Sequence, residues 1–347
     1  MPFINDVVKS NQENLAKAKA NSTPRLSRFL FKPENVIKNL SNQIIGQKQM
    51  IHAVGEVLQV IKADFGSESR PLSVMMFLGP TGVGKTETVK VLTESILGDA
   101  DKLCRIDMNT LSQEHYAASI TGAPPGYVGS KENTSLLKPE AIEGSFSRPG
   151  IVLFDEIEKA SKNVERSLLS VLDDGRLDLT GGTKQINFRN AIIFMTSNIG
   201  ASELSAYHKK FDTGWRSIFK WKPSKKMESE ILKNALEKKF DPEFINRIDR
   251  IVCFDRLESS SVQDLVKLNV KRLNKRLRKH NATLQLSKSA EDFFKSHYDE
   301  QYGARDLERK IIAHLEPALA FALNANPEIE TFTSKCRKNK ICISPKL

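Results

Sequence analysis

The feature that most constrains this chain is the sequence Gly-Pro-Thr-Gly-Val-Gly-Lys-Thr at residues 79–86, which fits G-x-x-x-x-G-K-[ST] at every fixed position. An apolar, β-prone run over residues 72–78 precedes it, and residues 87–97 follow with apolar side chains at helical spacing. A strand, a glycine-rich loop and a helix in this order predict a phosphate-binding loop (P-loop) rather than a chance turn. Glycines let backbone N–H groups converge on phosphate, and the helix N-terminus adds partial positive charge.

Two side chains at the end of this loop have expected roles. Lys85 supplies a positive charge for the β- and γ-phosphates of a nucleotide, and the Thr86 hydroxyl is placed to bind Mg²⁺. We therefore expect the nucleotide to be bound by Gly79, Pro80, Thr81, Gly82, Val83, Gly84, Lys85 and Thr86.

Two more apolar runs end in polar side chains that suit phosphate chemistry. Residues 151–156 read Ile-Val-Leu-Phe-Asp-Glu, which is typical of a strand buried on both faces of a parallel sheet. Open α/β sheets bind ligands at the carboxyl ends of such strands. We therefore expect Asp155 to hold Mg²⁺ and Glu156 to act as the general base toward the attacking water. Residues 191–198 form a similar run ending in Asn198, which either contacts the γ-phosphate or the water, or simply forms a turn.

Length and composition indicate a soluble protein with more than one domain. Of its 347 residues 39% are hydrophobic and 27% charged, and no apolar run is as long as a membrane span. The start lacks the pattern of a secretory signal and the four cysteines form no metal-binding pattern, so a reducing cytoplasm is the expected location. The predicted domains are a basic, partly disordered extension (1–40), a large α/β nucleotide-binding domain (41–255) and a smaller C-terminal domain (256–347).

Together these segments resemble the Clp-type AAA+ ATPases, and most closely the second ATPase module of ClpB/ClpA/ClpC-like unfoldases, from about residue 24 to near the C-terminus. The resemblance implies a P-loop fold, in which helices flank a parallel sheet and a smaller, mainly helical lid domain follows. It also implies hydrolysis of ATP with Mg²⁺ as cofactor. Besides the P-loop it is carried by Gly-Ala-Pro-Pro-Gly-Tyr-Val-Gly (122–129), Phe-Asp-Glu-Ile-Glu-Lys-Ala (154–160), Val-Leu-Asp-Asp-Gly-Arg-Leu (171–177), Asn-Phe-Arg-Asn (187–190), Met-Thr-Ser-Asn (195–198), Pro-Glu-Phe-Ile-Asn-Arg-Ile (242–248) and Gly-Ala-Arg (303–305).

The resemblance also implies the roles of particular site residues. Asn198 would be the first sensor of the γ-phosphate, and Arg305 would be the second sensor, on the lid domain. Arg247 would be an arginine finger that reaches the nucleotide of a neighbouring subunit, and Ile44 and Ile45 would pack against the adenine base. The catalytic residues implied in this way are Glu156, Arg247, Asn198 and Arg305.

A further implied role concerns a polypeptide substrate. Tyr127 would be the aromatic residue that grips the substrate in a central channel, and residues 180–184 would form a second pore loop. The predicted substrate loop consists of Gly126, Tyr127, Val128 and Gly129. The resulting hypothesis is an ATP-hydrolysing protein remodeller that assembles into a ring, expected to be a hexamer.

The sequence also departs from the family pattern. The short Ile/Leu-Gly-Phe/Leu tripeptide that docks a peptidase does not occur between residues 200 and 241. Residues 209–221 instead interleave basic and aromatic side chains, including Trp215 and Trp221. This segment is either a surface for a protein partner or an insertion that packs on its own body.

Two other functions stay open. One is an ATP-dependent assembly switch inside a larger machine such as a secretion apparatus, which would not need Tyr127. The other is a nucleic-acid motor or loader, which the formal net charge of +11 permits. Against the second stands the lack of a recognised helix-turn-helix, zinc or RNA-binding motif. The basic stretch at residues 267–279, on a predicted helix, is by itself typical of a solvated face.

Overall fold

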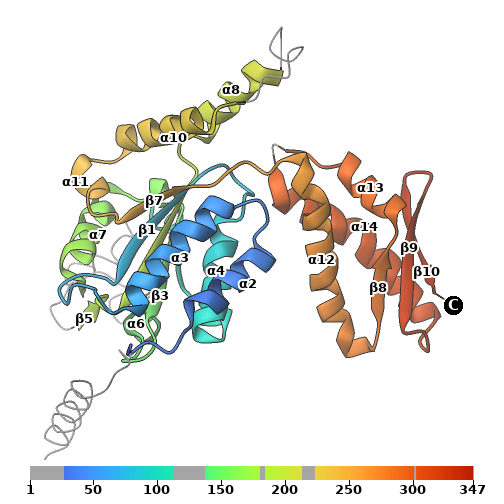
Figure 1. Cartoon of the computed structure of the whole chain (residues 1–347), viewed down its shortest axis with the longest axis horizontal. Helices are drawn as coiled ribbons and strands as arrows, with labels where there is room; N and C mark the ends of the chain where they lie inside the picture. Colours follow the sequence, from blue (N-terminus) through green and yellow to red (C-terminus); the bar gives the residue numbers. More distant parts are fainter. Residues whose placement is uncertain (1–26, 113–136, 180–183, 213–222, 301, 347) are drawn as a thin grey trace, which may run out of the picture.

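The computed structural model describes residues 27–112, 137–179, 184–212, 223–300 and 302–346, which form two lobes (Figure 1). In Figure 1 the first lobe is a sheet covered by helices, and the chain crosses from its last strand to a second, smaller lobe. Outside the described residues lie Gly126, Tyr127, Val128, Gly129, residues 180–183, Trp215 and Trp221.

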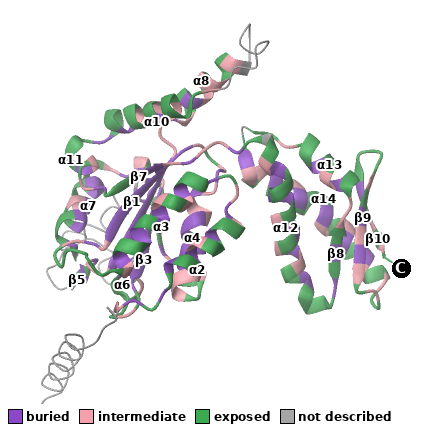
Figure 2. Cartoon of the chain, viewed as in Figure 1, coloured by how far each residue is buried: buried purple, intermediate pink, exposed green. Residues whose placement is uncertain are grey.

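Within the described residues, the first lobe is built on a five-stranded parallel sheet with the strand order β2-β3-β6-β1-β7. Every residue of β1, β3 and β6 is buried, as their continuous apolar sequences predict (Figure 2). The carboxyl ends of these strands meet at one edge of the sheet, where Leu78 is in register with Ser197. The strands are β1 (Ser73–Leu78), β2 (Cys104–Asp107), β3 (Gly150–Asp155), β6 (Ala191–Ser197) and β7 (Arg250–Cys253).

Alternate residues of the strands face two different hydrophobic cores. Met75 and Phe77 of β1 pack with one group of helices, whereas Val74 and Met76 pack with the other. Helices therefore cover both faces of the sheet, and the predicted α/β class is confirmed. The first group is α2 (Pro33–Gln43), α3 (Lys48–Lys62) and α4 (Lys85–Leu97); the second is α6 (Pro139–Glu143), α7 (Lys162–Asp174), α8 (Ala201–Asp212), α10 (Lys225–Lys239) and α11 (Pro242–Ile245).

The segment before residue 41 contributes to the first of these cores. Phe29, Phe31, Val36 and Leu40 are buried in the same cluster as Phe77. Residues 27–40 therefore contribute buried side chains to the core of the first lobe, although the sequence around them is polar and basic.

The second lobe has its own core, formed by three helices and, among the residues described, a three-stranded sheet with the order β10-β9-β8. Strand β9 is not predicted from the sequence, because only one of its two buried residues, Phe332 and Ser334, is apolar. The elements are α12 (Val262–Leu277), β8 (Thr283–Leu286), α13 (Lys288–Ser296), α14 (Gly303–Ala325), β9 (Thr331–Arg337) and β10 (Lys340–Pro345).

Short elements complete the chain. They are the hairpin of β4 (Arg176–Leu179) and β5 (Lys184–Asn187), and the 3-10 helices η1 (Ala100–Lys102), η2 (Thr110–Ser112), η3 (Ile157–Lys159), η4 (Ser259–Ser261) and η5 (Arg278–His280). None of the helices in the described ranges combines the length and the apolar character needed to cross a membrane.

Candidate nucleotide-binding site

A pocket of about 540 Å³ lies where the P-loop, the ends of β3 and β6 and the second lobe meet. The P-loop follows β1 and leads into α4, whose first residue is Lys85. The pocket brings together most of the residues that the sequence predicts for nucleotide chemistry. Its lining includes Ile44, Ile45, Thr81, Gly82, Val83, Gly84, Lys85, Thr86, Asp155, Glu156, Asn198 and Arg305.

Lys85 is held at the base of the pocket by three acceptors. Its ammonium donates to the backbone oxygens of Gly79 (2.6 Å) and Pro80 (2.8 Å) and to Oδ1 of Asn198 (2.8 Å). Burial lowers the pKa of Lys85 to about 8, although nearby carboxylates oppose the shift. Gly79 and Pro80 thus act through Lys85, positioning a cation where anionic phosphates would enter.

Asp155 lies among hydroxyl and guanidinium groups. The Thr86 hydroxyl donates to its Oδ1 at 3.2 Å, and the Thr196 hydroxyl donates to the same oxygen. Arg105 Nη2 lies 2.6 Å from Oδ2 and balances the charge of this buried carboxylate. A hydroxyl and a carboxylate on neighbouring elements are oxygen ligands of the kind that Mg²⁺ prefers, so Thr86 and Asp155 fit the predicted metal-binding pair.

Mg²⁺ rarely needs a cage made only of protein ligands, because it keeps water and substrate phosphate as ligands. The described residues contain no group of three or more His, Cys, Asp and Glu side chains that could hold a metal ion by themselves.

Glu156 follows β3 in a strained backbone conformation. Its φ of +57° is uncommon outside glycine, and such residues concentrate at functional sites. Its N–H donates to Thr196 Oγ1 at 3.1 Å, and Asn198 Nδ2 approaches Glu156 Oε1 at 3.5 Å. The Asn198 N–H is fixed by Glu158 Oε1 at 3.0 Å. The carboxylate and the amide are thereby held side by side in the pocket.

The residues predicted to pack against adenine lie between the two lobes. Ile44 is buried in the core of the first lobe, and Ile45 packs against the core of the second. Beyond them the Gln47 side chain exchanges two hydrogen bonds with the backbone of Asp255, at 2.8 and 3.0 Å. This fixes the wall of the pocket to the connection between the lobes.

The second lobe touches the P-loop directly. The N–H of Ala304, at the start of α14, donates to the Gly82 carbonyl at 3.0 Å. Both Gly82 and Gly303 have positive φ, and a Cβ on Gly82 would lie 2.5 Å from the Tyr302 carbonyl oxygen. Two glycines therefore permit this close approach, which places Arg305 on α14 at the pocket.

Arg247 lies elsewhere. It follows α11, with Nε 2.5 Å from Asp173 Oδ2 on α7 and Nη2 3.1 Å from Glu243 Oε1. The hydrogen bond and charge of Asp173 raise the pKa of Arg247 above its ordinary value. Arg247 does not line the pocket, whereas Arg305 does, so the two arginines of one chain lie at different places.

The sequence analysis missed residues that support the site. Arg105 is a charged residue in the short strand β2, in register with Leu153 of β3. Thr196 and Ser197 are polar residues at the end of the buried and otherwise apolar strand β6, a signal that could have identified Thr196. Arg272 of α12 pairs with Glu87 of α4 at 2.6 Å and forms a second link between the lobes.

Comparisons with known proteins agree with this geometry. The family described as AAA domain (Cdc48 subfamily) matches residues 70–251, and the C-terminal, D2-small domain of ClpB protein matches residues 257–331. The chain is 43% identical over 340 residues to the ATP-dependent protease ATP-binding subunit-like protein AmiB of Pseudomonas aeruginosa, covering 92% of both. It is 39% identical over 288 residues to the chaperone protein ClpB of Oceanobacillus iheyensis, covering 82% of this chain and 34% of that protein.

A similar solved structure is Hsp104 in its closed state with ATPγS and FITC casein. The TM-score is 0.74 at 28% identity, with 90% of this chain and 52% of the Hsp104 chain covered. The extended Hsp104:casein complex of S. cerevisiae gives a TM-score of 0.72. The chain therefore spans about half the length of Hsp104 and about a third of ClpB.

Proposed function

The chain belongs to the Clp-type AAA+ ATPases, and on that premise we propose that it forms a ring that hydrolyses ATP in order to thread polypeptides through a central pore. Membership in this chaperone family establishes nucleotide binding and ATP hydrolysis. One observation carries the proposal beyond that. The pocket is lined by P-loop residues 81–86, Asp155, Glu156 and Arg305, whereas Arg247 lies outside it.

Within one chain, the pocket residues divide the chemistry among them. Lys85 and Arg305 would bind the β- and γ-phosphates, and Glu156 would orient and deprotonate the attacking water. Asn198, beside Glu156, would hold that water or the γ-phosphate in place. Thr86 and Asp155 would hold Mg²⁺, which when bound offsets the negative charge on the phosphates.

Arg247 would complete the site of a neighbouring chain. An arginine finger supplied in trans contributes orders of magnitude to hydrolysis. A residue donated from one copy to the next requires head-to-tail contact, and such contacts form a ring when they close. We propose a hexamer, in line with the similarity to Hsp104.

The contact between α14 and the P-loop would convert phosphate chemistry into motion. Arg305 and the Ala304–Gly82 hydrogen bond lie on the same helix, so gain or loss of the γ-phosphate changes what holds this helix to the first lobe. The angle between the lobes would then follow the state of the nucleotide.

The proposed substrate is an unfolded polypeptide. Structures of Hsp104 contain casein, and this chain carries the motif with Tyr127 that fits a substrate-gripping pore loop. Residues 209–221 would add a surface for a protein partner, a role that Trp215→Ala with Trp221→Ala would test by loss of partner binding without loss of basal ATPase activity.

The deciding experiment measures ATP hydrolysis by the wild type and Tyr127→Ala, each alone, with casein and with single-stranded DNA. We expect casein to stimulate the wild type but not Tyr127→Ala. A rate unaffected by casein would overturn the threading function in favour of an assembly switch. Stimulation by DNA alone would overturn it in favour of a nucleic-acid motor.

A further inference from the structure

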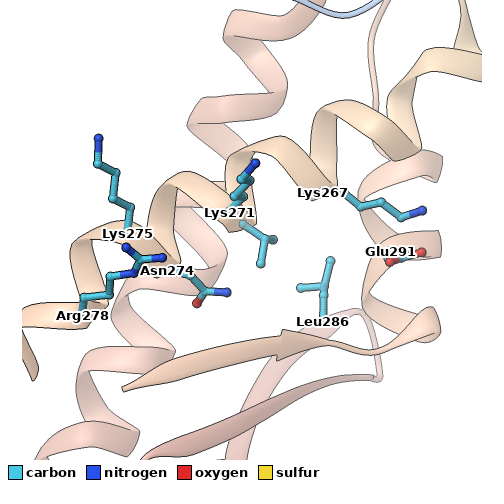
Figure 3. Close-up of a pocket in the computed structure, with 8 residues that line it drawn as sticks. Lys267, Lys271, Asn274, Lys275, Arg278, Leu286 and Glu291 are labelled. Atoms are coloured by element: carbon cyan, nitrogen blue, oxygen red, sulfur yellow. The ribbon is translucent and has the colours of Figure 1, made fainter. Parts of the chain in front are cut away.

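A second hollow lies in the second lobe, between α12, β8 and α13 (Figure 3). It shares no lining residue with the nucleotide pocket. Its volume is about 320 Å³. In Figure 3 the side chains of Asn274 and Leu286 lie between α12 and β8, whereas the side chain of Lys275 points away from β8. We call this hollow the basic groove, because four exposed cations on α12 and just after its end line one side of it: Lys267, Lys271, Lys275 and Arg278.

The cations on two sides of α12 differ in whether they have acidic partners. Arg272 and Arg276 point to acidic partners, Glu87 and Glu316 respectively. In the part of the chain that the structure describes, none of the four groove cations forms an ion pair. Their charge is therefore available to a ligand, whereas that of the two arginines holds the fold together.

The floor of the basic groove is preformed. The Asn274 side chain donates to the Leu284 carbonyl at 3.0 Å and accepts from the Leu284 N–H at 2.8 Å, which ties α12 to β8. These bonds occupy the outer edge of β8 at this residue, so a ligand cannot pair there as an added strand. Val270 and the partly buried Leu286 form the apolar part of the lining.

The charge of the basic groove is strongly unbalanced. Glu291 is the one carboxylate among its lining residues as described, and it accepts a hydrogen bond from Gln263 Nε2 at 3.0 Å. Four cations around one carboxylate complement a ligand that carries several negative charges.

We propose that the basic groove docks an acidic polypeptide segment of a partner protein, with an apolar side chain on the floor and carboxylates against the four cations. A peptide fits better than a nucleic acid because none of the described lining residues is aromatic, whereas proteins that bind single strands stack bases on aromatic rings. The inference does not depend on ring formation or threading.

The test is fluorescence anisotropy of a fluorescein-labelled dodecapeptide that alternates glutamate and leucine, titrated with the full chain. Lys271→Glu with Lys275→Glu should weaken binding at least about tenfold, because two attractions become repulsions. The neutral pair Lys271→Gln with Lys275→Gln should cause a smaller loss. Lys279→Glu with Lys335→Glu is the matched control, since it makes the same change in net charge at exposed sites outside the groove. Its affinity should stay within about twofold of wild type.

Other outcomes would overturn the proposal. Equal weakening by the control pair would show attraction to net charge rather than to the groove. Binding of a twelve-nucleotide oligothymidylate as tightly as the peptide, lost in the same variant, would identify a nucleic-acid site. A changed sedimentation profile of the Lys271→Glu, Lys275→Glu variant would identify a contact between copies. Basal ATP hydrolysis should be unchanged in this variant, which separates a docking defect from damage to the nucleotide site.

Discussion

The nucleotide pocket and the corner between α7 and α11 each hold an arginine with a predicted role in hydrolysis, but the two regions are built differently. Arg305 lines the pocket from α14, a helix hydrogen-bonded to the P-loop. Arg247 is held outside it by Asp173 and Glu243. One chain thus supplies the loop, the acids and one arginine, while the other arginine is presented at a different surface. This difference in packing supports the proposal that Arg305 acts in the pocket of its own chain and Arg247 in that of a neighbour.

Removing each arginine in turn should have the largest effect on activity. Arg247→Ala should lower kcat about a thousandfold or more, because charge stabilisation in the transition state is lost. Its affinity for ATP should stay within about twofold, since Arg247 does not line the pocket. Arg305→Ala should lower kcat and also weaken ATP binding. Phosphate release and titration with a fluorescent ATP analogue measure both, and equal weakening of affinity by the two changes would contradict the assignment.

Glu156→Gln tests a residue that is expected to act in the pocket of its own chain. It should slow hydrolysis by about a hundredfold or more, because the base is lost, while ATP binding persists on Lys85 and Arg305. Single-turnover kinetics measure the loss of hydrolysis, and an equilibrium titration measures the retained ATP binding. Turnover at the wild-type rate would remove Glu156 from the role of general base.

Lys85 in the pocket and Arg247 outside it differ in how their charge responds to pH. Burial lowers the pKa of Lys85 to about 8, whereas Asp173 keeps Arg247 charged throughout. Phosphates favour protonated Lys85, so ATP binding should take up a proton above pH 8 and weaken about tenfold from pH 7 to pH 9. Calorimetry at pH 8.5 in two buffers with different ionisation enthalpies measures the uptake. Affinity and uptake that do not change with pH would contradict a lowered pKa.

A substitution with a smaller expected effect tests the contact between the start of α14 and the P-loop, which positions Arg305. Gly303→Ala places a Cβ 2.9 Å from the Gly82 carbonyl oxygen at a φ of +63°, whereas Gly98 has a φ of +80° and nothing within 4 Å. Gly98→Ala is therefore a control for backbone strain alone, at about 1–2 kcal/mol. Gly303→Ala should cost about 1 kcal/mol more and weaken ATP binding about fivefold. Urea unfolding and ATP titration compare them, and identical effects would mean that the contact is unimportant.

The sequence predicted what is local and missed what is distant. The P-loop, the buried strands and the two acids at the end of β3 follow from patterns of a few residues, and the structure places Lys85, Thr86, Asp155 and Glu156 around one pocket. The ion pair of Arg105 with Asp155 depends on the order of strands in the sheet, which no local pattern contains. The hydrogen bond from Ala304 of α14 to the Gly82 carbonyl likewise joins residues more than two hundred positions apart.

The most direct test of a shared active site is to mix inactive subunits. Arg247→Ala mixed with Lys85→Ala should recover activity, because each Lys85→Ala neighbour still offers Arg247 to an intact pocket. With random mixing about a quarter of the sites would be complete. Glu156→Gln or Arg305→Ala mixed with Lys85→Ala should stay inactive, since those residues act in their own pocket. If energy transfer between labelled subunits shows mixed rings and the Arg247→Ala mixture still does not hydrolyse ATP, Arg247 does not act in trans.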